Sequence, residues 1–251
     1  MFHQRNALMK HPSLLKNIGS AAATPKTTIM KNTIASFLTI FILNISYSQN
    51  LNQGLMAYYS FDGHLLDHSI YQNDLRIING PIFYNHVSSE DLSVVFNGDS
   101  RVSTIQKFDT RGFREVSISF WFRSSTITND IQVMLQGAYL GFGIYLAPHT
   151  GKAMAFFDGS SSRAVQSKHS LSDGAWHHIV ATSNGRKTSL YVDGVFQGDR
   201  NETMKRGNGN YYNKLFFGRS NLDLQPFIGT LDEVRIYNRI LSQKEIDLLL
   251  K

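Results

Sequence analysis

The chain has 251 residues and no cysteine, and its 25 Lys and Arg residues exceed 19 Asp and Glu residues to give a formal net charge of +6. The lack of thiols excludes disulfides, thiolate metal sites and a cysteine nucleophile. Five basic residues and no acidic ones precede residue 49, so the rest of the chain has 20 basic and 19 acidic residues, close to +1. Because nucleic-acid binding needs a clustered excess of Lys and Arg, we expect no nucleic-acid partner.

The first 48 residues have the pattern of a leader. Residues 34–45 are an apolar run that follows Lys31 and precedes Ser46-Tyr47-Ser48, which is the order of a signal peptide. The run is too short for a membrane span, which takes about 20 apolar residues. We therefore predict a signal peptide over residues 30–48 and a secreted protein that is extracellular, periplasmic or held at the cell surface, and not integral to the membrane.

Two parts of this N-terminal region have alternative interpretations. The apolar run could instead stay in the membrane as an anchor, although polar Asn44 and Ser46 close it. Residues 1–29 are either an extension before a true start at Met30 or a long basic region of the leader. Residues 49–54 are a short linker to the folded domain, which is predicted over residues 55–251.

From residue 55 onward, short apolar stretches alternate with turns. A polar loop is expected over 62–74, and strands are predicted over 55–61, 91–96, 115–123, 131–135, 142–146, 153–157, 214–218 and 230–237. The segment Ser242 to Glu245 is a capping box that begins a short C-terminal helix. Because no helix is expected between the strands, the pattern favours an all-β, two-sheet antiparallel jelly-roll sandwich over a parallel sheet.

Residues 176–198 predict three strands joined by two tight turns. Asn184-Gly185 and Asp193-Gly194 are the dipeptides typical of type I′ hairpin turns, which need φ > 0 at both central positions. The pair His177-His178 lies on the first of these strands. Successive strand residues face opposite ways, so we expect the two histidines to be structural and not to bind one metal ion together.

Six short motifs follow one another between residues 57 and 241. They are AYYSFDG at 57–63, FNG at 96–98, ISFWF at 118–122, DGAWHH at 173–178, LYVDG at 190–194 and GTLDEVRIYNRIL at 229–241. In this order they resemble the laminin-G-like, concanavalin A-like lectin/glucanase jelly-roll family of secreted bacterial type. The resemblance covers residues 55–251 as one domain, and it departs from the family at residues 71–74, YQND, where many members have a Gly-Asn-Gly type loop.

The resemblance also implies a calcium ion, because the family often holds one between its opening strand and its penultimate segment. Carried over to this chain, it assigns Asp62, Asn73, Asp74 and Asp232 as oxygen ligands of one structural Ca²⁺. In the alternative, Asp62 caps a turn and Asp232 pairs with an arginine such as Arg235.

Aromatic residues in loops are the candidates for ligand binding, because a ring offers a sugar an apolar face and Tyr adds a polar handle. The candidates are Tyr71, Tyr139, Tyr211 and Tyr212, with Tyr84 as a further loop tyrosine. In the alternative, these rings cover sheet edges. Trp121 and Trp176 are expected to pack inside the sandwich.

Hydrolysis of a glycosidic bond needs two facing carboxyl groups about 5–9.5 Å apart. No glutamate after the leader lies in the E-x-D-x-x-E strand motif of laminarinase-type hydrolases, and Asp232 and Glu233 are expected on opposite faces of a strand. We therefore predict a secreted, non-catalytic recognition module that binds a glycan, with calcium as its implied cofactor. The alternatives are an adhesion or structural domain that binds a cell-surface protein through an edge strand, and a glycoside hydrolase or polysaccharide lyase.

Overall fold

The structure, a computed structural model, describes residues 50–86, 91–108, 113–138, 141–204 and 214–251. These residues belong to one compact unit. The predicted leader lies outside the described residues, as do Tyr139, Tyr211 and Tyr212. Within the described ranges, no helix is long and apolar enough to cross a membrane.

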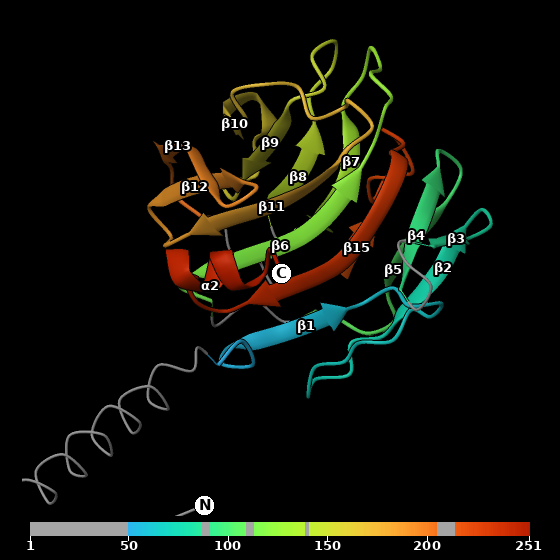
Figure 1. Ribbon diagram of the computed structural model, residues 1–251, viewed down its shortest axis with the longest axis horizontal. Coiled ribbons are helices and arrows are strands. Elements are labelled where there is room, and N and C mark those ends of the chain that lie inside the picture. Colours follow the sequence, from blue (N-terminus) through green and yellow to red (C-terminus); the bar gives the residue numbers. More distant parts are fainter. Residues whose placement is uncertain (1–49, 87–90, 109–112, 139–140, 205–213) are drawn as a thin grey trace, which may run out of the picture. The chain divides into compact units, whose positions relative to one another are not determined.

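Two antiparallel sheets form this unit (Figure 1). The strands of the first sheet are β1 (Leu55–Tyr59), β3 (Phe83–His86), β4 (Leu92–Asn97), β6 (Val116–Arg123), β11 (Trp176–Ser183), β12 (Lys187–Val192), β13 (Val195–Asn201) and β15 (Ile228–Tyr237). Their order is β13-β12-β11-β6-β15-β4-β3, and β1 pairs with β15.

The strands of the second sheet are β2 (Leu75–Asn79), β5 (Arg101–Thr104), β7 (Gln132–Ala138), β8 (Phe142–Leu146), β9 (Ala153–Phe156), β10 (Val165–Gln166) and β14 (Lys214–Phe217). Their order is β10-β9-β8-β7-β14-β5-β2. A 3₁₀ turn, η1 (Ser161–Arg163), and a helix, α2 (Gln243–Leu248), complete the described elements. The predicted all-β jelly roll with a short C-terminal helix is thereby confirmed.

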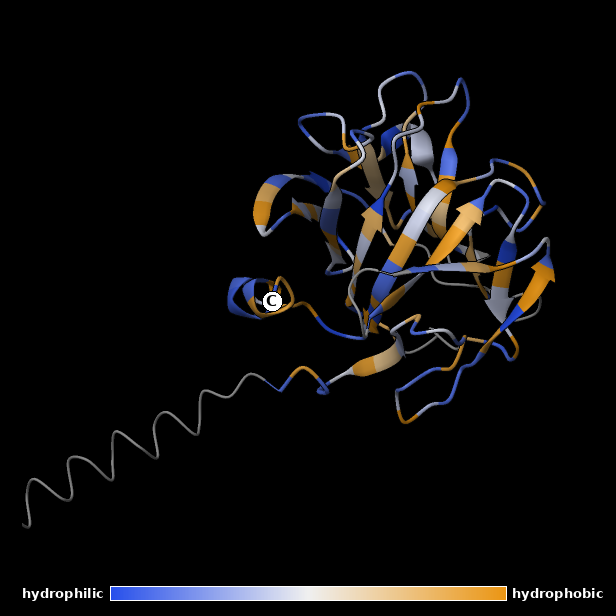
Figure 2. Cartoon of the chain, turned by 45° about the vertical axis from the view of Figure 1, so that its right-hand side comes forward, coloured by the Kyte–Doolittle hydropathy of each residue, from blue (hydrophilic) through white to orange (hydrophobic). Residues whose placement is uncertain are grey.

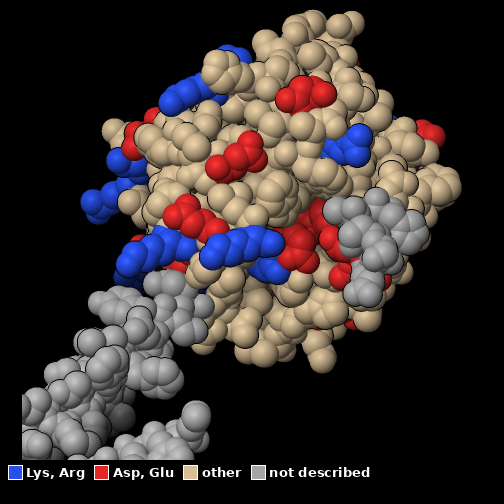
Figure 3. All heavy atoms as spheres, viewed as in Figure 1, with Lys and Arg blue, Asp and Glu red and all other residues tan. Residues whose placement is uncertain are grey.

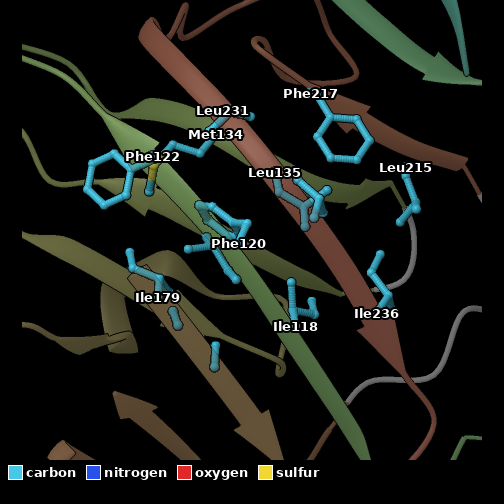
Figure 4. Close-up of a cluster of buried hydrophobic side chains, with 14 of the residues drawn as sticks. Ile118, Phe120, Phe122, Met134, Leu135, Ile179, Leu215, Phe217, Leu231 and Ile236 are labelled. Atoms are coloured by element: carbon cyan, nitrogen blue, oxygen red, sulfur yellow. The ribbon is translucent and has the colours of Figure 1, made fainter. Parts of the chain in front are cut away.

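The core lies between the two sheets (Figure 4). Ile118, Phe120 and Phe122 of β6 are fully buried there and lie across from Leu135 of β7 and Phe217 of β14. Residues two apart on a strand share a face, so the same strand turns its other residues outward. Figure 2 shows this alternation as hydrophobic and polar bands along the strands. Burial of each Phe or Ile side chain stabilises the fold by about 1.5–3 kcal/mol.

Strands β2, β3, β5 and β10 were not predicted. In β2, only Leu75 is buried and three of the five residues are exposed. Both β2 and β3 are the last strand of their sheet. An edge strand with few buried residues shows little alternation of apolar and polar residues in its sequence. Its backbone hydrogen bonds to the neighbouring strand define it, and these are not visible in the sequence.

The two predicted turns between β11 and β13 differ. Asp193 (φ 50°) and Gly194 (φ 76°) both have positive φ, so the predicted type I′ turn is confirmed. The prediction is wrong for the first turn, because only Gly185 has positive φ there and strand pairing stops at Ser183. The amide oxygen of Asn184 accepts two backbone N–H bonds, at 3.0 and 2.9 Å, and builds a longer loop.

Helix α2 covers one part of the outer face of the first sheet. It begins at the predicted capping box, in which the Glu245 carboxylate accepts a bond from the Ser242 backbone N–H at 2.8 Å. Its buried residue Ile246 packs against Val180 of β11 and Tyr237 of β15. The helix does not cover the other ends of β6, β11 and β15, and the candidate site lies on that part of the face.

Candidate functional site on the outer face of the first sheet

Strand register places two rows of side chains on the outer face of the first sheet. The first row runs across four strands and consists of Trp176, Arg123, Thr230 and Val95. The second row, two residues further along three of these strands, consists of His178, Trp121 and Asp232. The intervening residues of β6 point into the core, so both rows face away from it.

Both tryptophans therefore lie outside the sandwich. Trp121 and Trp176 are half-buried, and each lines a hollow on this outer face. The expectation that they pack between the sheets is wrong. Trp121 lies between Phe120 and Phe122, which occupy the core face, and the two-residue period of a strand sends it to the other side.

A first hollow, the Arg123 groove, has a volume of about 600 Å³. It is lined by Asn85, Ser93, Val95, Phe96, Asn97, Arg123, Ser124, Ser125, Thr126, Gly174, Trp176, Ile228, Gly229 and Thr230. Half of these residues have hydroxyl or amide side chains, and Arg123 is the only charged one among the described residues. The Arg123 Nε donates a hydrogen bond to the backbone oxygen of Gly174 at 2.7 Å, which fixes the guanidinium at the wall of the groove.

A second hollow, the acidic pocket, lies on the other side of Trp176 and has a volume of about 410 Å³. It is lined by Asp91, Trp121, Trp176, Asp232, Glu233, Leu249, Leu250 and Lys251. The two hollows share Trp176, so together they follow one sheet face.

A β-bulge in β15 explains why the acidic pocket contains two consecutive carboxylates. Asp232 pairs with Trp121 and Arg235 pairs with Ser119, so β15 has one residue more than β6 between these pairs. Glu233 takes up the extra length with φ 53°. Asp232 and Glu233 therefore line the same pocket, and the expectation that they point to opposite faces is wrong.

Asp232 is a buried carboxyl group in this pocket. It is 4% exposed, and burial, followed by the charges of Asp91 and Glu233, raises its pKa to about 8. Its Oδ1 accepts a bond from the backbone N–H of Glu233 at 2.9 Å. Within the described part of the chain Asp232 forms no ion pair, so the predicted pairing with Arg235 is also wrong.

Glu233 is held by two neighbours. The Tyr58 hydroxyl donates to its Oε1 at 2.7 Å, and Nη2 of Arg235 lies 2.5 Å from its Oε2. The Arg235 guanidinium also sits 4.0 Å above the centre of the Tyr58 ring. Both carboxylate oxygens of Glu233 are thus engaged by the strands β1 and β15.

The residues predicted to bind calcium come together only in part. Asp62 lies beside Asp91, and burial together with a hydrogen bond to Asp62 raises the pKa of Asp91. The charge of Asp62 also contributes to the raised pKa of Asp232. Asn73 donates to the backbone oxygen of Met56 at 3.2 Å, and Asp74 accepts from the backbone N–H of Asp67 at 2.9 Å.

This arrangement does not assemble the predicted ligand set. No three His, Asp or Glu side chains in the described ranges are placed to hold a metal ion. Asp62 accepts a bond from the backbone N–H of Leu92 at 3.2 Å, which joins two distant segments and is not the local bond of a turn cap. Figure 3 shows acidic and basic side chains gathered together on the face viewed there. The calcium ion stays a prediction.

The two histidines have separate structural roles, as predicted from strand alternation. His178 is buried against Trp121, with ring centroids 5.1 Å apart, and burial lowers its pKa to about 4. His177 bonds to Asp193 at 2.9 Å and to Asp173 at 3.1 Å. Burial lowers the pKa of His177, but these two carboxylates outweigh burial and raise it above its usual value.

The described loop tyrosine, Tyr71, lies away from this sheet face. It is 49% exposed and lines a third hollow of about 470 Å³ with Met56, Asn73 and Lys107. The residue after it, Gln72, has φ 50°, in the loop where the family resemblance favours Gly. Tyr84 belongs to β3 and packs against the core, so it is not a loop residue.

A profile of the concanavalin A-like lectin/glucanases superfamily matches residues 96–247. The chain belongs to this superfamily. The match spans the strands β6, β11 and β15 that build the outer face, and it confirms the family predicted from the six motifs. No curated protein matches the chain.

Solved structures share the fold at low sequence identity. Domain 4 of AbnA, a GH43 extracellular arabinanase from Geobacillus stearothermophilus solved with arabinotriose, has 21% identity and a TM-score of 0.62, over 78% of this chain and 98% of that domain. The structure described as showing cell entry of botulinum neurotoxin type C through two ganglioside molecules has 14% identity and a TM-score of 0.63, over 80% of this chain.

A third structure is the binding domain of botulinum neurotoxin DC with rat synaptotagmin II, with 15% identity and a TM-score of 0.61, over 80% of this chain. This chain spans about half of each toxin structure, 51% and 52%. At these identities the likeness establishes the fold alone.

Sequence reasoning missed the groove because its lining comes from distant segments. Asn85, Arg123, Trp176 and Thr230 meet only through the order of four strands in the sheet. One signal was available: Trp121 and Arg123 alternate with core phenylalanines on the clearest predicted strand, which places both on its outer face.

Proposed function

We propose that the protein is a secreted, non-catalytic recognition module that binds a glycan along the outer face of the first sheet. The observation that carries this proposal is the pair of hollows on either side of Trp176. A sugar ring has apolar C–H faces and a polar rim, so it fits an aromatic side chain flanked by hydroxyl and amide groups. The lining of the Arg123 groove has this composition.

The solved structures support the same class of ligand. The arabinanase domain was solved with arabinotriose, and one botulinum neurotoxin DC structure was solved with SialylT. Their low identity to this chain, 21% and 16%, means that the glycan of this protein has to be found by experiment.

A glycan array followed by calorimetric titration of the best hits tests the proposal. Trp176→Ala should remove binding, because an aromatic anchor at the centre of a site contributes about 2 kcal/mol or more. Tyr71→Ala is the matched control, since Tyr71 is a half-exposed aromatic residue in a different hollow. Uniform background signal across the array would contradict the proposal.

The same titration decides whether loop tyrosines bind the glycan instead. If Tyr71→Ala or the double substitution of Tyr211 and Tyr212 with Ala removes binding while Trp176→Ala retains it, the site belongs to the loops. Calcium dependence is proposed together with the glycan site. Calcium should raise the melting temperature of the wild-type protein and have a smaller effect on Asp232→Asn, and a protein that gives no heat with Ca²⁺ would rule it out.

A protein partner is the second candidate function. Val195 and Phe196 of the edge strand β13 are 61% and 44% exposed, and an extended segment of another chain could pair with such a strand. Binding by this route should survive Trp176→Ala and be lost in the double substitution Val195→Lys and Phe196→Lys. The affinity of each variant is measured with a protein ligand captured from candidate cell surfaces.

Glycoside hydrolysis is the third candidate, favoured by two carboxylates in one pocket beside two tryptophans. Against it, Tyr58 and Arg235 engage both oxygens of Glu233, so Glu233 is poorly placed to activate water or attack a sugar. We expect no new reducing ends and no unsaturated products when the protein is incubated with polysaccharides. Product formation that Asp232→Asn abolishes would establish the enzyme.

Secretion is proposed from the leader alone. When the full chain is expressed in a bacterium with a secretory pathway, the exported protein should begin at Gln49. N-terminal sequencing of the exported protein checks the cleavage position.

A further inference from the structure

The Arg123 groove has a positively charged side chain in an otherwise neutral described lining. Among the described residues that line it, Arg123 is the only charged one, so the described lining offers a ligand one positive charge and no carboxylate. On the other side of Trp176, the acidic pocket presents the carboxyl groups of Asp91, Asp232 and Glu233 together with Lys251. The two halves of this face therefore differ in the charged groups that they offer to an extended ligand.

The guanidinium of Arg123 is positioned to receive a ligand. Its Nε is used by the backbone oxygen of Gly174 at 2.7 Å. Its two terminal nitrogens form no ion pair or hydrogen bond with any residue of the described ranges, although the side chain is exposed. Asp173, the carboxylate next to Gly174, is bonded instead to His177 and to the backbone N–H of Ala175.

Trp176 stands directly beside this guanidinium. The two residues are paired across β11 and β6, and both line the groove. An arginine whose terminal nitrogens have no partner among the described residues can bind a carboxylate through two parallel N–H···O bonds, because both groups are planar. An aromatic side chain next to it offers a surface for the ring that bears this carboxylate.

We propose that the Arg123 groove binds a sugar that carries a carboxylate, a uronic acid residue within the glycan. The inference rests on the proposed glycan-binding function and names the class of glycan. Arg123 holds the carboxylate, Trp176 lies against the sugar ring, and the neutral hydroxyl and amide groups contact the remaining hydroxyls.

Calorimetric titration with defined probes tests this assignment. The probes are short oligomers of galacturonate, of mannuronate and of hyaluronan, each with its carboxyl-reduced neutral counterpart, and a sulfated neutral oligosaccharide. At least one uronate probe should bind, its reduced form should bind about tenfold or more weakly, and added salt should weaken only the charged probe.

Substitutions of Arg123 test whether this residue causes the preference for the uronate probe. Arg123→Gln should lose about tenfold or more in affinity for the uronate probe, and Arg123→Lys should recover part of it, because lysine keeps the charge and loses the planar fork. Arg76→Gln, an exposed arginine of β2 in the other sheet, is the matched control and should bind as the wild type does. An unchanged melting temperature for each variant shows that the fold is intact.

Four results would overturn the inference, and they separate it from the proposed function. Equal affinity for uronate and reduced probes, or wild-type affinity in Arg123→Gln, removes the inference and leaves glycan binding intact. If the protein prefers the sulfated probe to every uronate probe, the group that Arg123 binds is a sulfate and not a carboxylate. If no glycan of any class binds the wild-type protein, the proposed function and the inference both fail.

Discussion

The Arg123 groove and the acidic pocket lie on the same sheet face and share Trp176, yet their described charged groups differ: the groove has one arginine, and the pocket has three carboxyl groups and Lys251. The groove follows from regular strands, in which Trp176, Arg123 and Thr230 are directly paired. The pocket needs a departure from regularity, because the bulge at Glu233 turns a second carboxylate to the side of Asp232. A single extra residue in β15 thus places a second carboxyl group on one half of this sheet face.

The largest effect is expected from closing the floor of the groove. Gly229→Ala should destabilise the fold by about 1–3 kcal/mol, because its Cβ would lie 2.4 Å from Cζ of Phe227 and 2.5 Å from the backbone oxygen of Arg123. Urea unfolding measures the loss. The control is Gly198→Ala in β13, where the nearest atom would be 4.0 Å away, and equal stability of the two variants would contradict the close packing of this floor.

The next effect concerns the buried carboxyl of the acidic pocket. The pKa of Asp232 is raised from 3.8 to about 8, so the folded protein binds this proton more tightly than the unfolded chain. The stability that Asp232 contributes is complete at acid pH, below its unfolded pKa, and is lost as the pH rises from about 4 to about 8.

Asp232→Asn should therefore flatten the dependence of stability on pH over this range by at least about 1.4 kcal/mol, the equivalent of one pKa unit. Thermal unfolding at several pH values, with a chelator present, checks the difference. Asp199→Asn, at an exposed carboxylate that pairs with Lys187, should keep the wild-type profile. Parallel profiles for wild type and Asp232→Asn would mean that the carboxyl is not perturbed.

A smaller effect is expected where Glu233 is anchored. Tyr58→Phe removes the 2.7 Å hydrogen bond to Glu233 and should cost about 1 kcal/mol of unfolding free energy. Tyr191→Phe is a suitable control, because the Tyr191 hydroxyl has no hydrogen bond within the described ranges and its ring packs on Phe196. Chemical denaturation that gives the same midpoint for both variants would show that Tyr58 does not hold the bulge.

The smallest effect belongs to the loop that positions Arg123. His177 bonds to Asp173, next to Gly174, and its pKa is raised, so the stability it contributes is present below its ordinary pKa of 6.5 and is lost as the pH rises through its folded pKa. Both partner carboxylates are about half exposed, so the loss should stay below about 1 kcal/mol.

His177→Gln should remove this small pH dependence, as followed by thermal unfolding from about pH 5 to about pH 8.5. A variant that keeps the wild-type dependence would assign the titration to another group. His169→Gln, at an exposed histidine after β10, is the control for a general effect of losing a histidine.

Local patterns predicted much of this fold. The alternation in residues 115–123, the Asp193-Gly194 turn and the capping box at Ser242 are all present in the structure, because each depends on the stereochemistry of neighbouring residues. The first hairpin turn was predicted with the wrong geometry, because the Asn184 side chain bonds to the backbone and lengthens the loop. The edge strands β2 and β3 were missed because few of their residues are buried.

The candidate site was predicted less well. Two expectations failed for different reasons: the tryptophans were placed in the core, and Asp232 and Glu233 were placed on opposite faces. The first error disregarded the alternation of β6, whose core face is taken by phenylalanines. The second assumed a regular strand, whereas the register of β15 against β6 shifts between Asp232 and Arg235.

The sequence by itself determined the fold class, the family and the outward direction of the β6 side chains, because strand period, turn chemistry and ordered motifs are local properties of the chain. Only the tertiary structure decided that Arg123, Trp176, Thr230 and Asn85 line one groove and that Asp91 joins Asp232 and Glu233 in the next. These residues come from strands far apart in the sequence, and pairing between strands is a long-range choice that no local pattern encodes. The bulge at Glu233 was also decided by the tertiary structure, because a residue is extra only in comparison with the strand that pairs with it.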